Sequence, residues 1–416
     1  MSWIKTFLDQ TELYEAPRHY YFWSALAALS ASVKDHVWIA RSSKEYKTYP
    51  NIYVLLLAKT GITRKSHPVS LIERIVQEAN CTRVMSGRGS IEKILDDLGS
   101  ATTIGSGNGK VLIKDSAGFI VSGELSASII NNSQALTILT NLYDRNYNEG
   151  SWIVNLKSGV KKLNKPTVTF LAATNDEHMK SFFEAKDMYG GFLGRTFVVS
   201  ADAPKRLNAL LRPSSIVPNI KELAGYLTAI SKITGEFSLD EEVISTYENW
   251  YQNFYGPVQR GDSEVHDKTG TFSRIGDHTL KVAMLLALSE GTELVIKMEH
   301  MIEAISLCEP FVEISARAVR GIGKSTLANQ TAMIMEYLEI KDGHATRISI
   351  LQRFQGDIDH NDLTTISLTL EEAGFIAIEK HGSGHVYQVP KKVLEKYRAF
   401  KAAKKGGDAS HNSSKE

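Results

Sequence analysis

Short apolar runs alternate with amphipathic stretches between residues 46 and 205. The apolar runs are typical of strands at 52–57, 119–121, 168–172 and 196–199. Apolar residues recur at helical spacing in the intervals 66–79, 90–98 and 133–143. Strands that alternate with helices in this way are typical of a parallel sheet covered by helices. We therefore predict an α/β core over residues 46–205.

Helical patterns flank this core on both sides. Residues 1–45 contain two amphipathic segments separated by Pro17, and Phe22, Leu26 and Leu29 share an apolar face of the second. Residues 206–320 show helical periodicity, most clearly in HTLKVAMLLALSE and MIEAISLCEPFVEI. We expect an N-terminal helical segment and a helical lid domain.

A smaller unit is expected at residues 327–390. Three helical segments (332–340, 348–354 and 362–373) precede two strands, FIAIEK and HVYQV, which are joined at HGSGH. Three helices followed by a hairpin is the winged-helix arrangement, a helix-turn-helix variant. Residues 391–416 are expected to begin as a basic helix and to end in a disordered tail.

Composition places the chain among ordinary globular proteins. Its 416 residues are 23% charged and 43% hydrophobic, with a formal net charge of +1. Cys81 and Cys308 lie in unrelated segments, which excludes a disulfide framework or a cysteine zinc site and fits a reducing cytosol. No apolar stretch approaches the roughly 18–20 residues that cross a membrane, and the N-terminus lacks a signal-peptide pattern. We expect a cytoplasmic protein with no membrane partner.

The segment NIYVLLLAKTGITRKSHPVSLIERI, residues 51–75, carries the strongest chemical signal. An apolar strand, a short polar loop, Lys65-Ser66 and an amphipathic helix follow one another, which is the order of a nucleotide-binding P-loop. A helix N-terminus and loop N–H groups attract phosphate, Lys65 adds a positive charge, and Ser66 can ligate Mg²⁺. The expected nucleotide-binding residues here are Gly61, Ile62, Thr63, Arg64, Lys65 and Ser66.

This loop departs from the usual glycine pattern. Lys59 stands in the place of the first glycine, and Arg64 instead of glycine precedes Lys65. An ordinary strand–turn–helix is therefore the alternative interpretation. A second motif-like segment, GIGKST at 321–326, follows a charged helical stretch and not an apolar strand, so we interpret it as a linker between helices.

Three polar residues border the other predicted strands. Glu124 follows the strand at 119–121. A carboxylate at such a position can hold Mg²⁺ or polarise an attacking water. The alternative is that Glu124 is an ordinary solvated surface residue. Asn175 ends TVTFLAATN, where an amide can orient that water or simply form a turn. Arg195 precedes the strand at 196–199 and is either an arginine finger for a neighbouring subunit or a salt-bridged surface residue.

The expected winged helix has an unusual charge distribution. Its third helix contains acidic residues and no Lys or Arg, which disfavours direct base readout. Arg347, Arg353 and Lys380 suit contacts with DNA phosphates instead, and a protein-interaction module is the alternative. The acidic stretch 357–362 is interpreted as a helix cap and loop in preference to a metal site.

As an ordered set, these segments resemble a known family: P-loop ATPases of phages and mobile elements, often fused to or encoded beside a primase and similar to superfamily III replicative helicases. The residues that carry the resemblance, over roughly residues 15–315, are YPNIYVLLLAKTGITRKS, SGELS, NLYD (141–144), KPTVTFLAATN, GGFLGR and SRIGDHTLKVAMLLAL. Two departures are that the loop is one residue longer than the family's form and that Ala58 replaces its leading glycine.

The resemblance implies an AAA+/RecA-like P-loop NTPase that uses ATP and Mg²⁺. Lys65 would contact phosphate, Ser66 the metal, and Glu124 would be the catalytic carboxylate and a further metal ligand. Asn175 would be a sensor and Arg195 a finger acting in trans, whereas Arg274 or Lys281 in the lid would be a second sensor.

The expected function is an ATP-dependent DNA helicase or translocase in phage or mobile-element replication. We expect a hexameric homo-oligomer that hydrolyses ATP between protomers on single-stranded or forked DNA, with any primase acting in trans. An ATP-switched helicase loader or replication initiator, and a non-hydrolysing DNA-binding regulator on a degenerate ATPase fold, are the alternatives.

Overall fold

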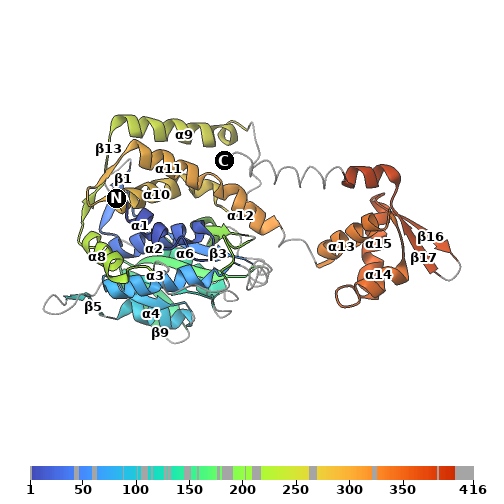
Figure 1. The fold of residues 1–416 in the computed structure, drawn as a ribbon, viewed down its shortest axis with the longest axis horizontal. Helices are drawn as coiled ribbons and strands as arrows, with labels where there is room; N and C mark the ends of the chain where they lie inside the picture. The colour runs from blue at the N-terminus through green and yellow to red at the C-terminus, as the bar shows by residue number, and fades with distance from the viewer. Residues whose placement is uncertain are drawn as a thin grey trace. The chain divides into compact units, whose positions relative to one another are not determined.

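The computed structural model describes residues 2–41, 46–58, 63–87, 89–100, 102–104, 111–113, 116–125, 129, 133–144, 151–156, 159–175, 179, 191–201, 203–208, 217–261, 269–320, 326–381 and 384–398. The chain forms two compact units, Met1–Ile322 and Gly323–Glu416 (Figure 1).

A five-stranded sheet lies at the centre of the first unit. All neighbouring strands are parallel, in the order β11-β3-β10-β7-β4. The strands are β11 Thr196–Ser200, β3 Tyr53–Leu57, β10 Thr167–Thr174, β7 Ala117–Ser122 and β4 Val84–Ser86. Four of them are the strands that the sequence predicts, so the α/β class with a parallel sheet is confirmed. β4 was missed because its three residues, VMS, are too few to form an apolar run.

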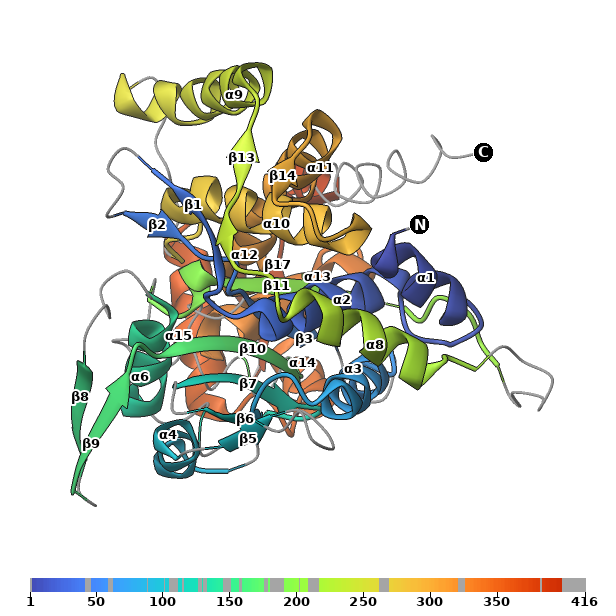
Figure 2. The same ribbon diagram turned by 90° about the vertical axis from the view of Figure 1, so that its left-hand side faces the viewer.

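Helices cover both faces of this sheet (Figure 2). Along β3, Val54 and Leu56 enter one buried cluster, whereas Tyr53, Leu55 and Leu57 enter another. The first cluster includes side chains of α2 Arg18–Val33, α3 Ser66–Ala79, α8 Ile220–Ile230 and α10 Ile275–Glu290. The second includes side chains of α4 Ile91–Gly99 and α6 Ser133–Tyr143. With both faces buried, polar chemistry is confined to the two edges where the strands end.

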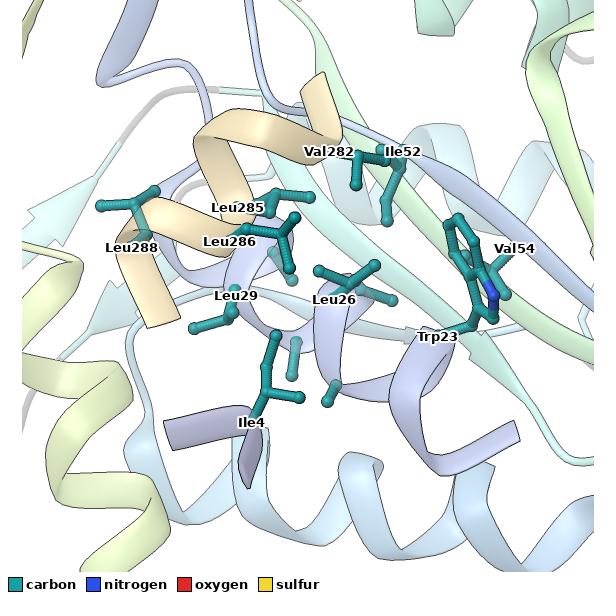
Figure 3. Close-up of a cluster of buried hydrophobic side chains, with 14 of the residues drawn as sticks. Ile4, Trp23, Leu26, Leu29, Ile52, Val54, Val282, Leu285, Leu286 and Leu288 are labelled. Carbon is teal, nitrogen blue, oxygen red and sulfur yellow. The ribbon is translucent and has the colours of Figure 1, made fainter. Parts of the chain in front are cut away.

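Helix α2 packs between the sheet and α10. Figure 3 shows Leu26 and Leu29 of α2 among side chains of α10, with Ile4 of α1 (Trp3–Gln10) beside them. The Tyr20 hydroxyl donates a 2.7 Å hydrogen bond to the carbonyl of Leu57, at the end of β3. The expected N-terminal segment, core and lid therefore share one hydrophobic core and form one compact unit.

Residues 37–40 correct the expectation that the whole N-terminal stretch is helical. They form β1 (Val37–Ala40), which pairs in parallel with β12 (Gly235–Glu236) and antiparallel with β2 (Lys47–Thr48). Helix α2 ends at Val33, and Lys34 adopts a positive φ of 56° that turns the chain into the strand.

The helical region after the sheet is confirmed as mostly helical. Its remaining elements are β13 Ser238–Leu239, α9 Glu241–Gln259, η4 Phe272–Arg274, β14 Val295–Ile296, α11 Met298–Cys308 and α12 Phe311–Arg320. Short additions to the sheet region are β5 Thr102–Ile104, β6 Val111–Ile113, β8 Ser151–Leu156, β9 Gly159–Asn164 and η3 Leu193–Arg195. Strands β8 and β9 pair as an antiparallel hairpin that extends away from the sheet (Figure 2).

The second unit consists of helices and a three-stranded antiparallel sheet in the order β15-β17-β16. Its elements are α13 Thr326–Ile340, β15 His344–Thr346, α14 Arg347–Arg353, α15 His360–Glu372, β16 Ala377–His381 and β17 Gly384–Gln388. The three predicted helices and two predicted strands are present, and β15 is an additional strand. Residues 391–398 are helical, and Val393, Leu394 and Tyr397 pack on this unit's core. The remaining tail and residues 321–325 of the GIGKST segment lie outside the described residues.

Candidate functional site at the edges of the parallel sheet

Three predicted site segments meet at the carboxyl edge of the sheet. Lys65 and Ser66 follow β3, Asn175 follows β10, and Glu124 follows β7. Since β10 lies between β3 and β7, Asn175 lies between the other two segments along this edge. The Ala58 N–H lies 3.5 Å from the Thr174 carbonyl, which ties the start of the loop to the end of β10.

The segments after β3 and β7 approach each other at Ser66 and Gly123. A Cβ built on Gly123 would lie 3.4 Å from the Ser66 Cβ, which is ordinary van der Waals contact. The residue before Glu124 therefore packs directly on the first residue of α3. The Ser122 hydroxyl donates a 2.5 Å hydrogen bond to the Glu124 carbonyl and fixes the turn after β7, with the Glu124 side chain exposed.

The N-terminus of α3 has features that suit an anion. Lys65 occupies the N-cap position without a side-chain capping bond, and the first turn contains no acidic residue. The Lys65 side chain therefore does not cap the helix, whose first N–H groups carry the positive end of the helix dipole. The Lys65 ammonium lies 3.3 Å from the Ala58 carbonyl and so reaches back across the loop.

Arg64 explains how this loop forms without a glycine before Lys65. Its φ is 52°, in the left-handed region that glycine favours, at the position where the motif places glycine. The Arg64 guanidinium donates a 2.8 Å hydrogen bond to Glu15, which also accepts from the Asn208 N–H at 3.0 Å. Contacts outside the loop therefore hold a backbone conformation that a glycine would adopt without strain.

The middle of the predicted loop, Gly61 and Ile62, lies outside the described residues. Thr63 is buried, and among the described residues its hydroxyl has no hydrogen-bond partner. The Thr174 hydroxyl, at the end of the neighbouring strand β10, is likewise buried without a partner. Each of these two buried hydroxyls lowers the stability of the fold by about 1–3 kcal/mol unless another group forms a hydrogen bond with it.

Arg195 lies at the opposite, amino edge of the sheet. It directly precedes β11, whose first residue pairs with Tyr53 at the start of β3. Its Nε donates a 3.0 Å hydrogen bond to Asp144, a second guanidinium nitrogen also pairs with that carboxylate, and Nη1 donates to the Gly191 carbonyl at 2.8 Å. Within one chain Arg195 is thus ion-paired, and it lies at the opposite end of the strands from Lys65.

Arg274 and Lys281 also lie at the amino edge. The Lys281 ammonium donates to the carbonyl and the side-chain oxygen of Asn51, each at 2.9 Å, and lies 3.9 Å from the centre of the Tyr143 ring. Arg274 donates to the Gly270 carbonyl at 3.0 Å. Asn51 precedes β3, and the five residues of that strand span roughly 17 Å. The length of β3 therefore separates both residues from Lys65 of the same chain, and their expected role as a second sensor stays a prediction.

The amino-edge residues that sequence reasoning left without a role are Asn51, Asp144 and His278. His278 Nε2 lies 2.9 Å from the Gly194 carbonyl, and burial lowers the pKa of His278 to about 3, so the ring stays neutral near pH 7. A signal exists for His278, because the stretch of α10 around His278 and Lys281 is apolar on nearly all sides and its polar residues must therefore be buried and paired.

The described residues contain no group of three or more His, Cys, Asp or Glu side chains placed to hold a metal. In the acidic stretch before α15, the Asp359 carboxylate accepts hydrogen bonds from the N–H groups of Asn361 and Asp362 at 2.7 and 2.8 Å. The expected helix cap is confirmed. Within the described part of the chain, no helix has the length and apolarity needed to cross a membrane.

The sequence matches no protein-family model and has no significant match among curated proteins. The edges of the sheet are therefore interpreted from their own geometry.

The strain at Arg64 gives a stability prediction. Arg64→Gly and Arg64→Ala both lose the pair with Glu15, but only alanine keeps a Cβ in the left-handed region. We expect the glycine variant to be more stable than the alanine variant by about 1 kcal/mol in urea unfolding. Equal stabilities, or a more stable alanine variant, would show that the backbone at this position is not strained.

The burial of Lys281 gives a pH prediction. Desolvation lowers the pKa of Lys281 to about 7, whereas an unfolded lysine titrates near 10.4. Between these values only the unfolded chain binds the proton, so this residue makes the free energy of unfolding rise with pH, by at most about 1.4 kcal/mol per pH unit. Lys281→Met should flatten that rise between pH 7 and 10, measured by denaturant unfolding. The exposed-site control Lys5→Met should keep the wild-type slope, and a Lys281→Met slope equal to wild type would contradict the prediction.

Proposed function

We propose that this chain is an ATP-driven DNA motor, a ring-forming helicase or translocase with an AAA+-like P-loop fold that acts in phage or mobile-element DNA replication. The observation that carries the proposal is the contact of Ser66 with Gly123, the residue before Glu124, at the edge that also holds Asn175. A phosphate-binding helix terminus, a carboxylate and an amide at one edge of a parallel sheet are the parts that ATP hydrolysis needs.

Each residue of this edge has a role in the proposal. Lys65 and the uncapped N-terminus of α3 bind the phosphates, and the Ser66 hydroxyl and Glu124 carboxylate hold Mg²⁺. Bound Mg²⁺ supplies charge neutralisation on the phosphate oxygens. The exposed Glu124 side chain orients and deprotonates the attacking water, with Asn175 as a second polar contact. The two unpaired hydroxyls, of Thr63 and Thr174, are consistent with an edge that a polar ligand completes.

Assembly follows from the separation of the two edges. Arg195 cannot reach the Lys65 edge of its own chain, because the full length of the strands lies between the two residues. A head-to-tail arrangement places the amino edge of one copy against the carboxyl edge of the next, and repeated rotation closes such contacts into a ring. A hexamer with ATP between protomers is the assembly we propose.

DNA contact is proposed for two surfaces. On the β8–β9 hairpin, Lys162 and the following Lys165 are exposed, as are Ile153 and Val160 at 58% and 67%. Such a strip can hold a DNA backbone electrostatically and pack against bases. The second unit, proposed to be a winged helix, exposes Lys380, Lys391, Lys392 and Lys396. Arg347 is instead held inside this unit by Tyr387, the His360 carbonyl and Thr364, which makes it a structural residue.

A helicase loader or initiator that switches on ATP binding is the second candidate. The observation that favours it is Gly123, because an acidic side chain at that position would lie against Ser66 and help to hold the metal. Without an acidic side chain at position 123, the site retains nucleotide binding more easily than rapid ATP hydrolysis. Strand-displacement assays on forked DNA separate the candidates, since a loader alone does not unwind the duplex.

Lys65→Ala tests the proposal directly. Removing the ammonium that contacts phosphate is expected to reduce DNA-stimulated ATP hydrolysis by about 100-fold or more, a loss comparable with that of an electrostatic catalytic contact. Phosphate release with and without single-stranded DNA is the measurement. The control Lys93→Ala removes an exposed lysine of α4 and should retain wild-type activity.

Two results would contradict the proposal: wild-type protein that binds no ATP, or a Lys65→Ala variant as active as wild type. Light scattering with ATP and DNA adds a check on assembly, because a protein that remains a monomer under all conditions is incompatible with a ring.

Gly123→Asp tests whether metal binding limits the rate of ATP hydrolysis. The added Cβ makes ordinary contact with the Ser66 Cβ, and Gly123 is not among the residues with positive φ, so the backbone accommodates aspartate. We expect hydrolysis to rise several-fold at low Mg²⁺, because a second carboxylate strengthens metal binding. ATPase rates across a Mg²⁺ titration are the measurement, with Gly123→Asn as the uncharged control. An unchanged Mg²⁺ dependence would show that metal binding does not limit turnover.

A further inference from the structure

Among the described residues, the amino edge of the sheet collects more basic than acidic side chains. The basic members are Arg41, Arg195, Arg274 and Lys281, and the acidic members are Asp144 and Asp277. Arg41 pairs with Asp277, and Arg195 pairs with Asp144. The group as a whole, here called the amino-edge cluster, thus has an excess of positive charge.

Close backbone packing brings two of these arginines together. Arg195 ends η3 and Arg274 ends η4. A Cβ added to Gly194 would lie 2.8 Å from backbone atoms of Thr269 and Gly270, so the two segments meet with no side chain between them. Each guanidinium is also anchored to a carbonyl of its own segment, that of Gly191 or Gly270. The positions of the two charges are therefore set by the fold.

The arginines repel each other, and Asp144 offsets this only in part. Burial, and then the charge of Arg195, lower the pKa of Arg274, which shows that the two guanidinium groups are close enough to interact. The Asp144 carboxylate pairs with Arg195 through two nitrogens and carries one negative charge. A phosphate group carries more charge and more acceptor oxygens, and it matches paired guanidinium groups better.

The cluster reaches the surface. The side chains of Arg195 and Asp144 are 11% and 26% exposed, and Arg274 is half-buried. An anion presented from outside the chain can therefore approach Arg274 and replace Asp144 at Arg195. The phosphates held at the carboxyl edge of the same chain are too far away, so the anion must come from another molecule.

We propose that the amino-edge cluster binds the terminal phosphate of a nucleotide held by a second copy of this chain, that Arg274 contacts this phosphate beside Arg195, and that Asp144 is the internal counter-ion that the phosphate displaces. The source of the phosphate rests on the proposed function. Arg274 thereby moves from a sensor for its own nucleotide to a contact with the neighbour's, and Asp144 keeps Arg195 neutralised and positioned until a neighbour arrives.

The anion site can be tested without ATP hydrolysis. In a Lys65→Ala background, which removes the phosphate-loop lysine, thermal unfolding is followed with inorganic tripolyphosphate. Adding Asp144→Asn should increase the upward shift in Tm by several degrees, because the internal counter-ion is gone. Adding Arg274→Ala to that double variant should abolish the increase. The control Asp9→Asn, which removes an acid that pairs with Lys5 at the surface, should not produce it.

The trans role can be tested by mixing full-length variants. Lys65→Ala supplies an intact amino-edge cluster, and Arg274→Ala supplies an intact phosphate loop. If Arg274 acts on the neighbour's nucleotide, an equal mixture should recover DNA-stimulated hydrolysis to roughly a quarter of wild type, the share of interfaces that random mixing repairs. Mixing Lys65→Ala with the double variant Lys65→Ala/Arg274→Ala should recover nothing.

The outcomes separate the two proposals. Equal Tm shifts for Asp144→Asn and Asp9→Asn, or an Asp144→Asn shift that survives Arg274→Ala, would overturn the anion site whatever the ATPase result. An active wild type whose mixture shows no recovery would overturn the trans role of Arg274 alone. An inactive wild type with a positive tripolyphosphate result would overturn the proposed function and the neighbour's nucleotide as the source, while leaving an anion site at this edge.

Discussion

The parallel pairing of β3 with β10 and β11 determines which side chains of this chain can meet. Every residue of β3 is buried, and successive residues enter the clusters on opposite faces. A strand buried in this way has no room for polar chemistry along its length. Whatever follows a strand must therefore gather at one edge of the sheet, and whatever precedes a strand must gather at the other. Ser66, Glu124 and Asn175 follow strands, whereas Asn51 and Arg195 precede them.

Support from outside the loop compensates for its unusual sequence. Helix α3 buries Val69, Ile72 and Ile75 in the core, so its N-terminus is held in place without a side-chain cap. Arg64 keeps a left-handed backbone, and its partner Glu15 comes from the segment between α1 and α2. That segment is fixed in turn because α2 packs between the sheet and α10. A loop that lacks the glycine before its lysine can thus adopt a glycine-like conformation there when tertiary contacts offset the strain.

The sequence predicted the parts of this architecture that depend on long apolar runs. The runs at 52–57, 119–121, 168–172 and 196–199 correspond to four of the five strands, because continuous burial leaves an unmistakable pattern. It did not reveal β4, which is too short, or the strand Val37–Ala40, which continues the apolar character of α2. Site residues placed directly after strands were located correctly at the carboxyl edge. The edge at which Lys281 lies could not be predicted, because the edge that a helix residue faces depends on how the helix packs across the sheet, and periodicity carries no information about that packing.

The two edges differ in charge in a way that bears on association between copies. The carboxyl edge presents an exposed Glu124 and a helix terminus suited to phosphate, and the amino edge carries the excess of arginine and lysine. The whole chain has a net charge of only +1, so no long-range field favours association. Attraction between copies must then be local, acting within about one Debye length, roughly 8–10 Å at physiological salt. In the proposed ring, a polyanion held at the carboxyl edge makes the two edges complementary, and head-to-tail contact then depends on bound nucleotide. In the proposed ring, the parallel sheet thus separates the two halves of each nucleotide site onto different subunits, and no single copy can complete one.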